Sequence, residues 1–180
     1  MIITISGQAG SGKSTIAKLL SAQLKLKHFS MGDLRRRMAE ERGMTLAALN
    51  KLGETQDFTD REVDEFQKRL GKEQDGFVVD GRTSWYFIPR SIKIYLEAKL
   101  RDRAKRVFQD ERSVEKFASL KDTEIALEER EASDRKRYRK YYGIDVYDRK
   151  HYDIVVDTTG MMPDRIADKI VEYIMERERL

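Results

Sequence analysis

The chain has 180 residues, 39% of them hydrophobic, and its 36 basic and 32 acidic side chains leave a formal net charge of +4. This length and apolar content suit one domain, residues 1–180, with a core of its own. The absence of cysteine excludes disulfides, thiolate catalysis and cysteine-bound zinc. Neither a secretory leader nor an apolar run of about 18 residues is present, so we expect a cytoplasmic protein that needs no membrane. We also expect a monomer.

The first predicted elements are a strand at 2–6 and a phosphate-binding loop. The strand-like run is apolar and β-branched, and Gly-x-x-x-x-Gly-Lys-Ser follows it at residues 7–14, before an amphipathic helix. This is the Walker A pattern in the context it needs, although an ordinary glycine-rich turn remains the alternative. Lys13 should bridge the β and γ phosphates of a nucleoside triphosphate, and the Ser14 hydroxyl should bind Mg²⁺. The predicted donor-binding loop is Gly7, Gln8, Ala9, Gly10, Ser11, Gly12, Lys13, Ser14 and Thr15.

Four further strands are predicted at 27–30, 77–80, 92–96 and 152–157, with helical patterns between them. The last helical pattern is the clearest, because Ile166, Ile170 and Ile174 form one apolar stripe. Strands and helices that alternate in this way predict an α/β fold with a five-stranded parallel sheet and helices on both faces. Ligands should therefore gather at the carboxyl ends of the strands.

Arginines follow two of these predicted strand ends. Arg36 lies shortly after Ser30, and Arg82 follows Asp80 and Gly81. A guanidinium group suits a phosphate dianion, so a second anion site beside the Walker A loop indicates a phosphorylated acceptor. The alternative is that residues 35–37 are a solvated helix face.

Several stretches together resemble the nucleoside monophosphate kinases, and most of all the archaeal cytidylate kinases. They are ISGQAGSGKST, HFSMGDLRR, MAEERGMTLAALNK, DREVDEFQK, VVDGRTSW, RAKRV, REASDRKRYRKYYGID and YDIVVDTT. The resemblance implies a P-loop kinase fold with an NMP-binding insert at about 31–75 and a short lid at about 109–122. It also implies phosphoryl transfer from MgATP to CMP, and to dCMP, giving CDP or dCDP and ADP.

The same resemblance suggests roles at the strand ends. Arg36 and Arg82 would grip the acceptor's α-phosphate, while Asp80 would organise Mg²⁺ through water. Asp33 would join the magnesium shell, although an aspartate at this place can equally cap a helix. Ser30, Gly32 and Gly81 complete this part of the predicted acceptor site.

Two arginine-rich helical patterns flank the predicted lid. Arg130, Asp134 and Arg137 share one helix face, and the resemblance assigns them to the acceptor's ribose and phosphates. The alternative is a solvated helix with ion pairs such as Glu131 with Arg135. Lid arginines would stabilise charge in the transition state and exclude water. Further lid candidates are Arg103 and Arg106 for the donor, Arg135 for catalysis, and Arg112.

Base recognition is predicted from fewer signals. The relatives in bacteria carry an aspartate where this chain has Thr83, so Asp64 and Gln67 are the main candidates, with Trp85 nearby. A carboxylate would accept from the cytosine amino group and disfavour uracil. The alternatives are a solvated helix for the first two and aromatic packing for Trp85. The predicted acceptor set is Ser30, Gly32, Arg36, Asp64, Gln67, Asp80, Gly81, Arg82, Trp85, Arg130, Asp134 and Arg137, and the predicted catalytic set is Lys13, Arg82, Arg130 and Arg135.

Two other functions stay open at this point. Adenylate kinase, or another nucleoside monophosphate kinase, would keep the phosphate-handling residues and differ in the base pocket. A nonenzymatic P-loop module that binds RNA would use the positive charge and the arginine helices, although nothing in the sequence demands nucleic acid. A GTPase is disfavoured because Asn50-Lys51 is followed by Leu52-Gly53, which breaks the guanine motif.

Overall fold

The fold is built around five parallel strands, seen here in a computed structural model that describes residues 1–110 and 116–178. Their order across the sheet is β2-β3-β1-β4-β5. The strands are β1 (Ile2–Gly7), β2 (Lys27–Ser30), β3 (Phe77–Asp80), β4 (Ile92–Glu97) and β5 (Ile154–Asp157). The predicted five-stranded α/β fold is therefore confirmed. β5 begins later than predicted because the Tyr152 N–H closes the short 3₁₀ turn η1 (Arg149–His151).

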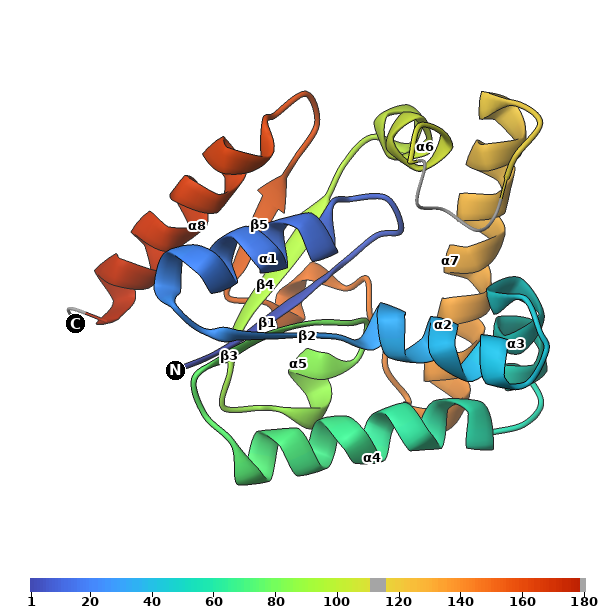
Figure 1. Cartoon of the computed structure of the whole chain (residues 1–180), viewed down its shortest axis with the longest axis horizontal. Coiled ribbons are helices and arrows are strands. Elements are labelled where there is room, and N and C mark those ends of the chain that lie inside the picture. The colour runs from blue at the N-terminus through green and yellow to red at the C-terminus, as the bar shows by residue number, and fades with distance from the viewer. Residues whose placement is uncertain (111–115, 179–180) are drawn as a thin grey trace.

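Helices cover both faces of the sheet (Figure 1). α1 (Lys13–Leu24) and α8 (Pro163–Glu178) lie on one face, and α4 (Phe58–Glu73) and α5 (Ser84–Phe87) lie on the other. Alternate residues of a strand point to opposite faces. In β3, Val78 accordingly packs in the core cluster of Leu20 and Ile170, whereas Phe77 and Val79 pack with helices of the other face. Each face thus carries a buried apolar cluster, as expected for a parallel sheet.

Two insertions extend from the sheet. α2 (Met31–Glu41), α3 (Leu46–Gly53) and α4 lie between β2 and β3, and α6 (Leu100–Phe108) and α7 (Leu120–Tyr142) lie between β4 and β5. α7 runs beside α3 (Figure 1), where the Tyr141 hydroxyl donates to the Gly53 carbonyl at 2.6 Å. The predicted NMP-binding insert corresponds to the first of these insertions.

The predicted lid at 109–122 falls between α6 and α7. Its central residues 111–115, with the lid candidate Arg112, lie outside the described residues. Its end is already helical, because the Ser119 hydroxyl accepts the Asp122 N–H and caps the first turn of α7. The division into an insert and a lid stays a prediction. No helix in the described ranges is long and apolar enough to cross a membrane.

The carboxyl ends of the strands meet at one edge of the sheet. The register pairs Ser30 of β2 with Asp80 of β3, and Gly7 of β1 with Leu96 of β4. β1 pairs with β3 on one side and β4 on the other. The connection after β1 runs to β2, on the β3 side, and the connection after β4 runs to β5, away from β1, so the end of β1 lies at the switch point of the sheet. The glycine loop starts at this point.

Candidate active site

The glycine loop needs its glycines for steric reasons. Gly7, Gly10 and Gly12 all have positive φ angles, of 142°, 77° and 92°. A Cβ atom on Gly7 would lie 2.0 Å from the Leu96 carbonyl oxygen, so a side chain there would push the loop away from β4. The Lys13 ammonium group donates to the Gln8 carbonyl oxygen at 2.6 Å and lies beside the loop backbone.

One arginine of α6 holds this loop in place, and a second holds the loop after β5. Arg103 is 4% exposed and donates to the carbonyl oxygens of Ala98 and Ala9, each at 3.0 Å. Arg103 thus supports the loop from inside the protein, and its role as a lid residue for the donor stays a prediction that these contacts do not favour. Arg106 donates to the Thr158 hydroxyl and carbonyl oxygens at 2.9 and 2.6 Å, and so joins α6 to the loop after β5.

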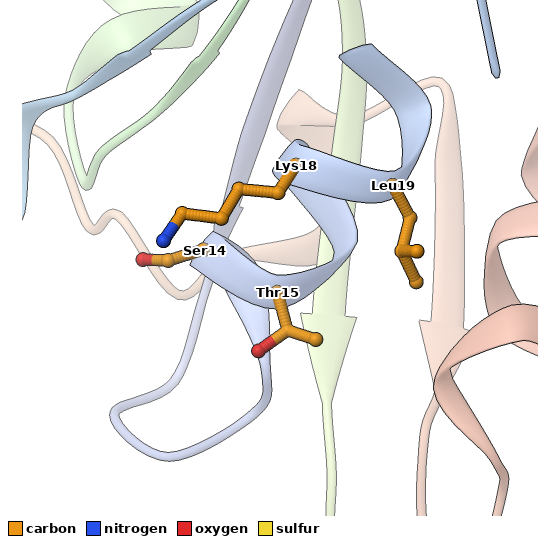
Figure 2. Close-up of a pocket in the computed structure, with 4 residues that line it drawn as sticks. All are labelled: Ser14, Thr15, Lys18 and Leu19. Atoms are coloured by element: carbon orange, nitrogen blue, oxygen red, sulfur yellow. The ribbon is translucent and has the colours of Figure 1, made fainter. Parts of the chain in front are cut away.

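The first turns of α1 present polar groups beside the loop. A shallow pocket of about 240 Å³ is lined by Ser14, Thr15, Lys18 and Leu19. Figure 2 shows that the Ser14 hydroxyl and the Lys18 ammonium point to the same side of the helix. Lys18 did not figure in the predicted site, although its place one turn after Ser14 was a signal for it.

Asp80 ends β3 and faces the start of α1. Its Oδ2 accepts hydrogen bonds from the hydroxyls of Ser14 at 2.8 Å and Ser30 at 3.2 Å, and its Oδ1 lies 2.7 Å from His28 Nε2. A carboxylate and a hydroxyl are oxygen ligands of the kind that Mg²⁺ prefers. Two of the three groups predicted to hold the metal, Ser14 and Asp80, therefore meet here, and their chemistry fits it.

Asp33 lies apart from this contact. Its side chain is 54% exposed and pairs with Arg36, which is 43% exposed. The alternative role of Asp33 as helix N-cap is wrong, since the cap of α2 is Ser30, whose hydroxyl accepts the Asp33 N–H. The assignment of Asp33 to a magnesium shell stays a prediction.

Asp134 of α7 holds Arg82 at the end of β3. Arg82 Nε and the Tyr147 hydroxyl each donate to Asp134 Oδ2 at 2.8 Å, and Arg137 donates to Oδ1 at 2.5 Å. Burial alone would raise the pKa of Asp134, but the Arg82, Arg137 and Arg130 guanidinium groups outweigh it and hold this pKa well below its usual value. The carboxylate therefore stays ionised and fixes Arg82 against α7.

A second buried carboxylate continues this chain of charges into the insertion after β2. Asp60 Oδ1 accepts from Arg137 at 2.6 Å and from Arg35 at 3.0 Å, and Arg35 also donates to Asn50 Oδ1 at 2.8 Å. The alternative of a solvated helix face is thus wrong for Arg35, which is 9% exposed. Arg35 shares one face of α2 with Met31 and Met38, which are also buried. This helical spacing was the signal for the burial of Arg35.

The two residues predicted to recognise the base are buried. Asp64 is 5% and Gln67 is 0% exposed, so the alternative of a solvated helix is wrong. Gln67 donates to the Thr83 hydroxyl at 3.2 Å and accepts from the Ser84 hydroxyl at 2.7 Å. Asp64 accepts from the Tyr142 hydroxyl. Burial raises the pKa of Asp64 to about 7, and the hydrogen bond from Tyr142 opposes this shift.

The remaining candidates differ in their surroundings. Trp85 is 7% exposed and stacks on His151 with ring centroids 4.4 Å apart, which is a packing contact. Arg135 turns toward Asp145, at 3.0 Å, and lies over the Tyr147 ring. The acceptor role of Trp85 and the catalytic role of Arg135 stay predictions that these contacts do not favour.

Cations converge on the glycine loop from separate segments. The pKa of Lys13 is lowered well below its usual value, first by burial and then by the charges of Arg82 and Arg130. The carboxylates of Asp80 and Asp134 oppose this effect. A bound phosphate would relieve the repulsion among these cations, so the arrangement favours a polyanion between the loop and α7.

Comparison with known proteins agrees with this arrangement. The family model described as "Cytidylate kinase-like family" matches residues 2–160. The cytidylate kinase of Natronomonas pharaonis is 39% identical over 168 residues, which cover 92% of this chain and 85% of that protein. The cytidylate kinase of Pyrococcus furiosus is also 39% identical, over 92% of this chain and 84% of that protein.

A solved structure supports the fold. The shikimate kinase from Acinetobacter baumannii, in complex with shikimate, superposes with a TM-score of 0.64 at 16% identity and covers 98% of this chain and 93% of that chain. At this identity the likeness concerns the fold alone. The match to the family model and the two relatives decide the family. The chain belongs to the cytidylate kinase-like family.

Proposed function

We propose that this protein transfers the γ-phosphoryl group of MgATP to CMP, and also to dCMP, giving CDP or dCDP and ADP. The convergence of Lys13, Arg82 and Arg130, whose charges act on one another beside the glycine loop, carries the proposal, since it brings a donor loop and a second anion site together. Family membership supports the choice of acceptor. Free nucleotides are then its partners, and neither nucleic acid nor a membrane is needed.

The donor would bind at the glycine loop and the start of α1. Backbone N–H groups of the loop and the positive end of the helix dipole hold the phosphates, and Lys13 swings from the Gln8 carbonyl onto them. Ser14 and Asp80 would hold Mg²⁺, which neutralises charge on the phosphates. Arg106, beside the loop after β5, would lie near the nucleoside of the donor.

The acceptor's phosphate would bind to Arg82. Its Nε is committed to Asp134, and no bond from its terminal amino groups to another part of the described chain is present, so these groups can grip the α-phosphate. Asp134 fixes the plane of the guanidinium group before the substrate arrives, which lowers the entropic cost of binding. Arg36, at the exposed start of α2, would reach the same phosphate after closure of the insert.

Closure and base recognition follow from the two insertions. The insert at about 31–75 would carry Asp64 and Gln67 to the cytosine, with ionised Asp64 accepting from its amino group. Residues 109–122 would act as the lid and bring Arg130 to the transferred phosphoryl group. Phosphoryl transfer needs positioning and cations more than a base, so no general base is assigned.

An acceptor panel tests this proposal. CMP, dCMP, UMP and AMP are offered at equal concentration with fixed MgATP, and nucleoside diphosphates are identified by chromatography. We expect CDP and dCDP to dominate. A clear preference for AMP would indicate an adenylate kinase, and salt-sensitive RNA binding without any diphosphate product would indicate an RNA-binding module.

A further inference from the structure

His28 contacts Asp80, but the proposed function assigns it no role. It lies on the edge strand β2, two residues before Ser30, so both side chains point to the same face of the sheet. The register pairs Ser30 with Asp80 and His28 with Val78. Val78 packs on the face covered by α1. The imidazole is therefore on the side of the sheet from which Ser14 reaches Asp80.

Hydrogen-bond accounting assigns each oxygen of Asp80. A carboxylate oxygen accepts hydrogen bonds, so we assign the hydrogen between the two groups to His28 Nε2, which lies 2.7 Å from Oδ1. The other oxygen, Oδ2, accepts from the hydroxyls of Ser14 and Ser30. Asp80 is 3% exposed, so little solvent is present to hold Oδ1 in place of the imidazole.

We propose that His28 is a positioning residue, whose Nε2–H holds Oδ1 of Asp80 so that Oδ2 and the Ser14 hydroxyl are presented together to Mg²⁺. The inference rests on the proposed function, because Ser14 and Asp80 are the proposed metal-binding groups. Without this hydrogen bond, only the two serine hydroxyls hold the Asp80 carboxylate. It can then turn about its Cβ–Cγ bond and move Oδ2 away from the Ser14 hydroxyl oxygen. Partners that orient metal ligands in this way typically contribute about 10-fold to 100-fold to metal affinity.

Loss of this hydrogen bond should affect the binding of Mg²⁺ and not the binding of the nucleotide phosphates. The phosphates of a nucleotide are held by the loop N–H groups and Lys13, none of which bonds to His28 in the described chain. Loss of the imidazole donor should therefore weaken Mg²⁺-dependent binding and leave metal-free nucleotide binding unchanged.

Calorimetry of ADP binding, in EDTA and in saturating Mg²⁺, tests the inference. The gain in ADP affinity on adding Mg²⁺ should fall about 10-fold or more in His28→Phe and His28→Leu, which lack the donor. His28→Gln should restore most of the gain, since its amide N–H reaches a similar position. His151→Phe is the matched control because it keeps an aromatic ring against Trp85, and its Mg²⁺ effect should equal that of the wild type.

The outcomes separate this inference from the proposed function. A wild-type Mg²⁺ effect in both His28→Phe and His28→Leu would overturn the role of His28 and leave the proposed function standing. So would an equal loss of ADP affinity with and without metal, which indicates a structural role only. If Mg²⁺ does not change ADP affinity in the wild-type protein, the metal site of the proposed function fails, and the role of His28 fails with it.

Discussion

Replacing Asp64 with asparagine removes a buried carboxyl group whose pKa is raised, mainly by burial, from 3.8 to about 7. A folded-state pKa above the unfolded value means that the folded chain binds an extra proton between these two pH values. The free energy of unfolding therefore falls as the pH rises through this window. Between pH 5 and pH 8 the loss from this one group is about 2.5 kcal/mol.

The Asp64→Asn variant does not titrate, but its amide oxygen can still accept from Tyr142. Its stability relative to the wild type should therefore be about 2.5 kcal/mol more favourable at pH 8 than at pH 5. Urea unfolding followed by circular dichroism at both pH values measures this difference. Glu40→Gln, on the exposed surface of α2, is the control and should show a much smaller change. An equal stability difference for Asp64→Asn at both pH values would refute the reasoning.

Three further predictions concern the loop, the insert and the acceptor site. Gly7→Ala places a Cβ 2.0 Å from the Leu96 carbonyl oxygen and should cost at least about 2 kcal/mol in a urea titration, whereas unchanged stability contradicts the loop geometry. The hydrogen bonds from Lys136 and Lys51 lower the pKa of Glu54 to about 2, and the bond from Lys136 has the larger effect. Glu54→Gln should thus lose stability at neutral pH, with the loss shrinking as the pH falls from about 4.5 toward 2, and a loss that does not depend on pH would count against the ion pairs. Arg82→Ala should raise the KM for CMP at least about 10-fold with little change for ATP, whereas equal losses for both substrates would place Arg82 elsewhere.

The sheet and the donor loop were predictable because their signals are local. The strand at 2–6, the Walker A spacing and the helix after it lie within the first 24 residues, and each is a short-range pattern. Asp80 was also predictable, because it follows a buried apolar run and parallel strand ends meet at one edge. The shared face of Asp64 and Gln67 followed from their spacing along one helix.

The charge pairing was not predictable, because its partners are far apart along the chain. Arg82 and Asp134 are separated by 52 residues, and Arg137 and Asp60 by 77. Local charge patterns cannot tell a solvated arginine from one buried against a distant carboxylate. For the same reason the sequence pattern around Arg103 does not reveal that this side chain holds the loop backbone from inside the protein.

Transfer of the phosphoryl group to the acceptor is the central claim, and isotope tracing tests it directly. The protein is incubated with γ-labelled ATP, Mg²⁺ and CMP, and the products are separated before many turnovers have occurred. We expect the label in the β-phosphate of CDP, with little inorganic phosphate, because a kinase that positions both nucleotides and excludes water passes the phosphoryl group to CMP and not to water. Label released only as inorganic phosphate, at a rate that CMP does not change, would contradict the account.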